Sequence, residues 1–187
     1  MRFVRTGRPA GPADRSGDAE AGQSLVEFAL VLTPLFMLLL GIIQFGFIFN
    51  TYVTLTNATR DAAREGTVYV YDRTKTKDLN DLARNEEIRS TLLASMNLLS
   101  KTAPRFTTGS TWTAATGTGT KTYTNGDLRI TYTVPSGTTE SDPRTGQQIT
   151  VVASYHQDLI IPLIAELLPR DSGGRLVLTG EVTMVAN

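Results

Sequence analysis

Glu27 is the only charged residue in a long apolar run that extends from Gly22 to Phe49. A carboxylate in apolar surroundings is tolerated when a cation neutralises it. Cleavage of the chain after Gly22 would supply such a cation, because Gln23 would then carry a free α-amino group. The small residues Ala21 and Gly22 lie before the run and not after it, so any cleavage should remove the polar leader and keep the apolar helix. A cut after Gly22 would allow an ion pair between Glu27 and the new amine.

The residues alone leave two roles open for Glu27. In the first, Glu27 pairs with the amine of Gln23, in the same chain or in a neighbouring one. Such a pair would set the axial register between packed helices, as a buried polar residue does in a coiled coil. In the second, Glu27 lies at the level of the lipid headgroups and serves only as a feature that a peptidase recognises.

No other group of residues has the spacing of a catalytic or metal site. The chain has no cysteine, and its single histidine, His156, is not accompanied by a G-x-S-x-G nucleophile motif. The acidic residues of the second half are too scattered for a metal-binding loop; these are Asp142, Asp158, Glu166 and Asp171. We expect His156 to be a surface or packing residue, and we expect no enzyme, metal or cofactor.

The apolar run is long enough to cross a membrane. Its Leu, Ile, Val and Phe residues favour insertion by about 5–10 kcal/mol in total. A carboxylate at the bilayer centre would cost about 2.5–3.5 kcal/mol, and Glu27 lies near the end of the run, where the cost is lower. From Phe28 to Phe49 a helix would be about 33 Å long, against about 30 Å for the hydrocarbon core. We therefore predict a transmembrane helix over residues 23–49.

Two residues interrupt this run. Pro34 removes one backbone hydrogen bond, and a simple kink is the favoured interpretation. Gln44 could form a hydrogen bond to another helix or lie near the outer interface of the membrane, and we favour the second.

Residues 1–22 are expected to be a cytoplasmic leader. They are polar, rich in Gly, Pro and Arg, and without apolar periodicity, so we expect disorder. Four arginines precede the run, whereas Asp61 and Glu65 accompany the arginines that follow it, which places the N-terminus inside. An ordinary secretory signal fits less well, because its apolar region has about 7–15 residues and small residues follow it. Here bulky residues 47–50 follow.

The segment around Gly22 resembles a type IV prepilin cleavage site. In that family the cut follows a glycine, and the mature chain has glutamate at its fifth position with an aromatic or apolar residue next, as Glu27 and Phe28 would be. The string GQSLVEFALVLTPLF, and the later ATRDAAREG from Ala58 to Gly66, resemble the TadE/TadG-like pseudopilins of tight-adherence (Tad) pilus systems. The TadE, TadF and TadG-like subtypes stay open.

This resemblance implies a minor pilin or pseudopilin that takes part in assembly of a Tad pilus for surface adherence. It implies cleavage between Gly22 and Gln23 by a prepilin peptidase, and an assembly or register role for Glu27 and Phe28. The implied partners are the peptidase, other pilins, the assembly platform and membrane lipid. Zero net charge argues against nucleic acid as a partner. The alternative is an uncleaved, single-pass binding module.

The helix is expected to continue beyond the membrane over residues 50–66. Apolar and small residues recur there at helical spacing, and Gly66 would be the C-cap. The recurring residues are Tyr52, Leu55, Ala58, Thr59, Ala62 and Ala63. Residues 67–71 are either a short strand or the end of the helix turning away. The extension should pack on a globular head.

Residues 67–187 are expected to form one extracytoplasmic α+β domain. A second helix should run from Asp78, its cap, to Ser100. Its buried stripe would be Ile88, Leu92, Met96 and Leu99, and its solvated face Arg84, Glu86, Glu87 and Arg89.

The second half of the chain predicts an antiparallel sheet. Alternation over Leu128–Val134 and the Asn125-Gly126 pair predict a hairpin. Further strands are expected over 149–155 and 176–185, with an apolar link or helical turn over 160–168. The Gly- and Thr-rich segment before the hairpin should be mobile. Trp112, Tyr123 and Tyr132 are expected to pack in the core. The predicted fold is thus a long helix continuing into a small α+β head, as in type IV pilins.

Overall fold

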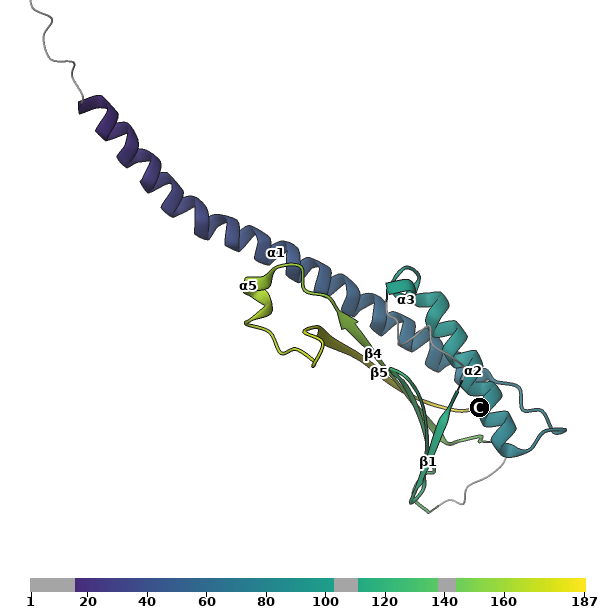
Figure 1. Cartoon of the computed structure of the whole chain (residues 1–187). Coiled ribbons are helices and arrows are strands. Elements are labelled where there is room, and N and C mark those ends of the chain that lie inside the picture. Colours follow the sequence, from purple (N-terminus) through teal and green to yellow (C-terminus); the bar gives the residue numbers. More distant parts are fainter. Residues whose placement is uncertain (1–15, 103–110, 138–143) are drawn as a thin grey trace, which may run out of the picture. The chain divides into compact units, whose positions relative to one another are not determined.

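The computed structural model describes residues 16–102, 111–137 and 144–187 (Figure 1). In these ranges the chain forms one long helix, a second helix, two four-residue helices and a five-stranded antiparallel sheet. The chain divides into two compact units, Met1–Ile42 and Ile43–Asn187. The predicted α+β class, with a long N-terminal apolar helix, is confirmed.

Helix α1, Ser16–Val68, contains the whole apolar run. Residues 16–22 are helical, which differs from the disorder predicted for the leader. Among the described residues, α1 is the one helix that is long and apolar enough to span a membrane.

The end of α1 differs from the prediction at Gly66. The sequence predicts Gly66 as the C-cap, whereas the helix continues to Val68. A Cβ atom at Gly66 would lie 2.6 Å from Cδ1 of Ile88. Gly66 therefore permits close packing of α1 on the second helix. Of the two alternatives for residues 67–71, the end of a helix is correct and the strand is wrong.

Helix α2, Lys77–Met96, begins after Thr76. The hydroxyl oxygen of Thr76 accepts a hydrogen bond of 3.4 Å from the N–H of Leu79, so Thr76 and not Asp78 is the N-cap. A cap residue lies outside the helix and reaches an amide in its first turn, and Asp78 is already inside. The helix ends where Asn97 adopts a positive φ of 52°, and α3, Leu99–Thr102, follows.

One face of α2 is buried as predicted, whereas the expected solvated face is only partly exposed. The buried stripe is confirmed for Ile88, Leu92 and Met96, and Leu99 of α3 packs against it. Arg84 is 4 % exposed, because its guanidinium group lies over the rings of Tyr69 and Tyr132. The prediction that Arg84 belongs to the solvated face is therefore wrong.

Five antiparallel strands form one sheet in the order β1-β2-β3-β4-β5. They are β1 Thr113–Gly117, β2 Thr120–Asn125, β3 Leu128–Thr133, β4 Gln148–Gln157 and β5 Leu176–Val185. The four-residue helix α5, Pro162–Ala165, lies between β4 and β5. The predicted hairpin, the two later strands and the helical turn are all confirmed.

Two details of the first hairpins differ from the predictions. Asn125 is the last residue of β2 and pairs with Leu128, so the turn residues are Gly126 and Asp127. Gly126 has a φ of 57°, as expected for glycine at the first central position of a type II′ turn. Strand β1 lies in the segment for which mobility was predicted, and it is ordered by pairing with β2 through a turn at Gly119.

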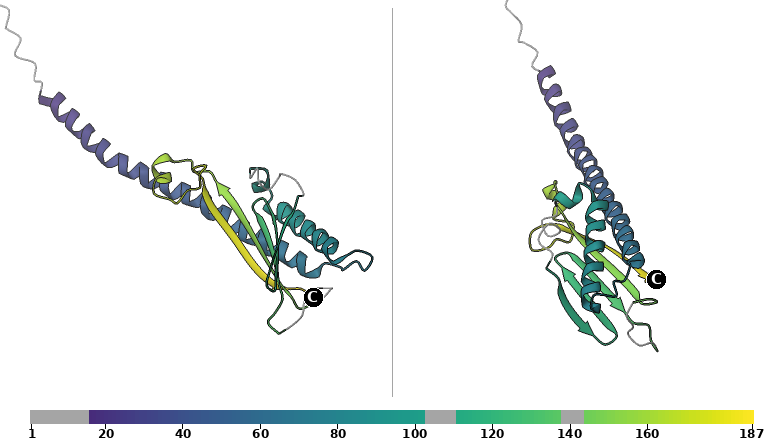
Figure 2. Two further views of the ribbon diagram at one scale, coloured as in Figure 1. Left: turned by 60° about the horizontal axis from the view of Figure 1, so that its bottom comes forward. Right: turned by 90° about the vertical axis from the view of Figure 1, so that its right-hand side faces the viewer.

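The core of the second unit lies between the sheet and two helices, α2 and the later part of α1 (Figures 1 and 2). Five of the six recurring residues predicted for this extension are buried, namely Leu55, Ala58, Thr59, Ala62 and Ala63. Tyr52 is the exception at 47 % exposed. Helix α1 approaches β5 closely at Gly180, where a Cβ atom would lie 2.7 Å from Oγ1 of Thr59. This contact joins the helix to the far edge of the sheet.

Candidate functional site

The predicted processing and register residues occupy adjacent turns of α1 in the first unit. Gly22 has open space around it, since an added Cβ atom would meet nothing within 4 Å. Nε2 of Gln23 donates a hydrogen bond of 2.9 Å to Oε1 of Glu27. Phe28 is 64 % exposed. The four residues are thus accessible in the single chain, and two of them are already in contact.

The partner of Glu27 in this chain is the side-chain amide of Gln23. Residues four apart lie on the same face of a helix, which explains the contact. While Gly22 precedes Gln23, the backbone nitrogen of Gln23 is an uncharged amide. Cleavage after Gly22 would convert this nitrogen into an amine and would place a positive charge one turn from the carboxylate.

Apolar side chains of the first unit face outward around this carboxylate. The most apolar 18-residue window of α1 has 0 % of its residues buried within the chain. Leu25, Leu30 and Leu38 are examples, each exposed by 61 % or more. A continuous apolar surface of this size marks contact with a membrane or with other proteins. The first unit therefore has the surface of an anchor or of a packing helix.

Pro34 lies inside α1 without ending it. Proline has no N–H, so the carbonyl group of Leu30 loses its usual helical donor. One residue earlier, the hydroxyl group of Thr33 donates a hydrogen bond of 2.9 Å to the carbonyl oxygen of Ala29. Hydroxyl groups of this kind commonly accompany bends in apolar helices.

Gln44, in the second unit, is fully buried. Its Oε1 atom accepts a hydrogen bond of 2.9 Å from the backbone N–H of Ile160. Two turns later on α1, the hydroxyl group of Thr51 donates a hydrogen bond of 2.8 Å to Oε1 of Gln157. Neither sequence interpretation of Gln44 included a partner in the head, because that partner is 116 residues away in the chain.

The head contains a buried ion pair that the sequence does not indicate. Arg144 is 2 % exposed, and its Nε and Nη2 atoms each donate a hydrogen bond of 2.6 Å to one carboxylate oxygen of Asp81. The hydroxyl group of Tyr123 donates a hydrogen bond of 3.0 Å to the same carboxylate. Burial raises the pKa of Tyr123 to about 12. Both oxygens of Asp81 are therefore occupied, and the neighbouring tyrosine stays protonated.

The same cluster continues one turn along the buried face of α2. The guanidinium groups of Arg84 and Arg144 lie 5.8 Å and 4.3 Å from the centre of the Tyr132 ring. The hydroxyl group of Tyr132 donates a hydrogen bond of 2.6 Å to Oδ1 of Asn85. Burial raises the pKa of Tyr132. Cations over aromatic faces and a bidentate carboxylate are strong, directional contacts. This arrangement fixes α2 on the sheet.

His156 joins three segments of the head. Its Nδ1 atom lies 2.6 Å from Oδ2 of Asp171, and its Nε2 atom lies 3.2 Å from Oδ1 of Asp127. Only 10 % of the side chain is exposed. Because both ring nitrogens face carboxylates, neither is placed to take a proton from a nucleophile. Of the two predicted roles, surface residue or packing residue, the structure shows the second for His156.

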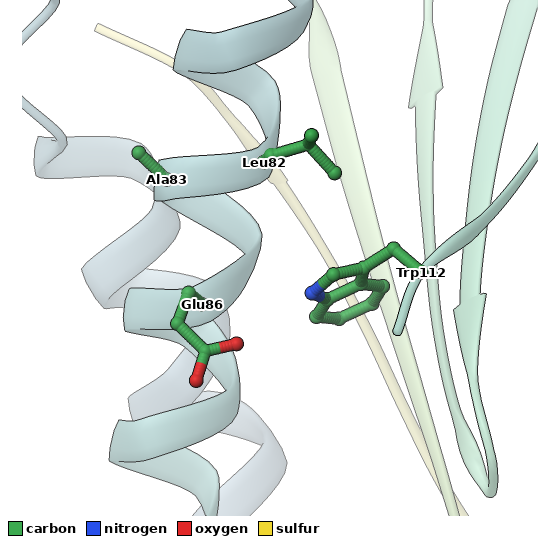
Figure 3. A pocket seen from close by; sticks show the side chains of 4 residues that line it. All are labelled: Leu82, Ala83, Glu86 and Trp112. Carbon is green, nitrogen blue, oxygen red and sulfur yellow. The ribbon is translucent and has the colours of Figure 1, made fainter. Parts of the chain in front are cut away.

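The indole ring of Trp112 faces α2 across a shallow groove of about 530 Å³ (Figure 3). Leu82, Ala83 and Glu86 line the helical side of the groove. The carboxylate of Glu86 is engaged by Arg89, and this contact lowers the pKa of Glu86. The predicted core packing is confirmed for Tyr123 and Tyr132, which are buried, while Trp112 packs against the edge of the core.

The scattered acidic residues do not come together. Within the described ranges, no group of three or more histidine and acidic side chains could hold a metal ion. Glu166 pairs with Arg170 at 2.8 Å. Asp158 is exposed at the end of β4, and Asp142 lies outside the described residues.

The described parts of the chain thus combine a long N-terminal apolar helix with a small α+β head. Residues 22–64 match the model of a family described as TadE-like protein. The match includes all four predicted site residues and supports a TadE-like protein of the Tad pilus system, as the resemblance predicted. No curated protein and no solved structure matches the chain.

Proposed function

We propose that this chain is a pseudopilin or minor pilin that takes part in assembly of a Tad pilus for surface adherence. The observation that carries the proposal is Glu27, a lone carboxylate on an outward-facing apolar helix within the TadE-like segment. Its role is structural and not enzymatic. Two findings support this view. Residues 22–64 match the TadE-like family, and the polar side chains around Asp81 and His156 are bonded to one another.

The proposed topology assigns each part of the chain to one side of the membrane. Residues 1–22 are a cytoplasmic leader, 23–49 the transmembrane helix, 50–66 its extension, and 67–187 the extracytoplasmic domain. A prepilin peptidase cuts between Gly22 and Gln23. Two observations support cutting there: Gly22 has open surroundings, and glycine weakens a helix by about 1 kcal/mol relative to alanine.

After cleavage, Glu27 pairs with the amine of Gln23, in its own chain or in a neighbouring subunit. The existing contact between their side chains, at 2.9 Å, already holds the carboxylate near this nitrogen. In an apolar medium an unpaired carboxylate is costly, so a helix stack in the correct register is favoured over a shifted one. Phe28, beside the pair, fills the adjoining surface between helices. The partners are therefore the peptidase, other pilins and the assembly platform.

The direct test is the N-terminal residue of the mature protein, measured by mass spectrometry on native membranes with and without the system's own peptidase. The proposal requires a mature chain that begins at Gln23 only when the peptidase is present. A chain that keeps its leader under both conditions would instead identify an uncleaved, membrane-anchored binding module.

The register role has its own prediction. We expect Glu27→Leu to keep membrane insertion but to lose pilus assembly, because the apolar helix is retained and the ion pair is lost. Surface pili counted by microscopy, with membrane fractionation alongside, would measure both effects. Glu181→Leu, at an exposed carboxylate of β5, is the matched control and should assemble normally. Normal assembly of Glu27→Leu would contradict the role.

A further inference from the structure

The connection between β4 and β5 carries an apolar segment, residues 159–169 (LIIPLIAELLP), called here the α5 segment. Ile160 is 68 % exposed and Leu167 is 81 % exposed. Glu166 is the only charged residue of the segment, and its carboxylate faces Arg170 at 2.8 Å. The segment therefore presents two large apolar side chains to its surroundings.

The α5 segment lies beside α1 at the level of the apolar run (Figures 1 and 2). The chain leaves β4 at Gln157, which contacts Thr51, and reaches Ile160, which donates its N–H to Gln44. From Thr51 back to Gln44 the helix rises about 10 Å. The chain therefore runs beside α1 from the level of Thr51 to the level of Gln44, both in the second unit.

Gln44 lies inside the apolar run, about 7.5 Å along the helix from its last residue, Phe49. Side chains of interfacial segments are buried about 5–10 Å into the boundary between headgroups and acyl chains. If residues 23–49 cross the bilayer, the depth of Gln44 matches this zone. Ile160 is held at the same depth by the hydrogen bond to Gln44.

We propose that the α5 segment inserts into the headgroup–acyl boundary of the membrane and gives the head a second contact with lipid. The proposal rests on the membrane anchor of the proposed function. Gln44 then has a clear purpose, because a backbone N–H placed in an apolar medium needs a partner from the protein. Its fully buried amide supplies that partner from α1.

The charges around the segment fit a lipid surface. Arg170 and Arg175 follow the segment in the chain, and both side chains are partly exposed. Arginine side chains at such boundaries extend their charged ends to the headgroups. On α1, Phe45 and Phe47 are also exposed at this level, so the apolar surface continues from the helix to the segment. This continuity favours lipid over a second copy of the chain as the occupant.

Site-specific labelling tests the proposal on the full chain in phospholipid vesicles. The chain has no cysteine, so one introduced cysteine takes a polarity-sensitive NBD dye without side reactions. The test variant is Leu167→Cys. Leu38→Cys reports on the span itself. Val70→Cys is the control, because Val70 is 85 % exposed and follows the end of α1, roughly 36 Å beyond Gln44.

If the segment contacts lipid, the NBD emission at Leu167→Cys should be blue-shifted. The intensity of this emission should fall when the lipids carry a spin-label quencher at headgroup depth. Leu38→Cys should be blue-shifted, and Val70→Cys should be neither shifted nor quenched. A water-like emission at Leu167→Cys, with Leu38→Cys in lipid, would overturn this inference and leave the anchor intact. A blue shift that lipid quenchers do not reduce would assign the segment to a protein contact and overturn it too. A water-like emission at Leu38→Cys would refute the anchor, and the inference with it.

Discussion

At the scale of single residues, the head depends on charges that have left water. Asp81 and Arg144 are 2 % exposed and bonded to each other through two hydrogen bonds. Removal of one member of such a pair leaves the other charge buried without compensation, and this costs more than the pair itself contributes. Two tyrosines also depend on the pair. Tyr123 donates a hydrogen bond to Asp81, and the guanidinium group of Arg144 lies over the ring of Tyr132.

Arg144→Met should therefore destabilise the protein by about 3–5 kcal/mol. Thermal unfolding of the full chain in detergent, followed by circular dichroism, would measure the change. Lys75→Met removes the exposed pair with Asp72, 3.2 Å long, and should change stability by at most about 1 kcal/mol. Equal effects of the two variants would show that the buried pair has no special role.

A second residue-scale prediction concerns acid. The N–H of Arg175, followed by His156 and the N–H of Gly173, stabilises the ionised form of Asp171 and lowers its pKa. A carboxylate with a lowered pKa contributes stability above its unfolded pKa of about 3.9, and the contribution is lost as the pH falls through the folded pKa. Asp171→Asn should thus be less stable than the parent chain at pH 6, and the difference should shrink below about pH 4.

Urea titrations of both chains at several pH values would measure this dependence. Asp158→Asn is the control, because it makes the same chemical change at an exposed carboxylate at the end of β4. A difference between Asp171→Asn and the parent chain that stays constant down to pH 3 would exclude the proposed electrostatic cause.

At the scale of elements, glycines set the distances between helices and sheet. At Gly180 an added Cβ atom would lie 2.7 Å from Oγ1 of Thr59 and 3.4 Å from Cγ of Leu55. At Gly66 the nearest atom would be Cδ1 of Ile88. Both glycines therefore allow α1 to lie closer to its neighbours than any larger residue would permit.

Gly180→Ala should push α1 away from β5 and destabilise the fold by about 1–3 kcal/mol. Adding Thr59→Ala removes the clashing oxygen, so the double variant should recover part of the loss. Gly46→Ala, in open space on α1, is the control and should not destabilise the chain. Unfolding in urea would compare the three variants, and a double variant no better than Gly180→Ala would contradict the steric explanation.

At the scale of the whole molecule, α1 contributes different residues to the apolar run and to the core. The core of the second unit includes no residue before Leu55. We therefore expect a fragment of residues 50–187 to unfold cooperatively by heat, since all its core contacts remain. The amide of Ile160 should lose protection from hydrogen exchange in this fragment, because Gln44 is missing. A fragment without a cooperative transition would show that the membrane-proximal turns are required for folding.

Prediction from sequence succeeds where a property repeats along one element. The alternation over Leu128–Val134 identified β3, and helical spacing identified the stripe that contains Ile88. The same reasoning fails for Arg84 and Gln44, which resemble solvent-facing or interfacial residues in every local pattern. Their partners lie in other elements, so no window along the chain contains the information.

The sequence by itself determined that this protein has an apolar N-terminal helix with one carboxylate and a small α+β head. Hydropathy, helical spacing and turn residues are local, and they are sufficient for element type. The candidate residues Gly22, Gln23, Glu27 and Phe28 follow from the resemblance of their segment to a prepilin cleavage site. Only the tertiary structure decided that Asp81 meets Arg144 and that Gln44 holds the α5 segment. These contacts join residues 63 and 116 positions apart. They form because a folded chain must pair each buried charge and backbone group wherever a partner comes within reach.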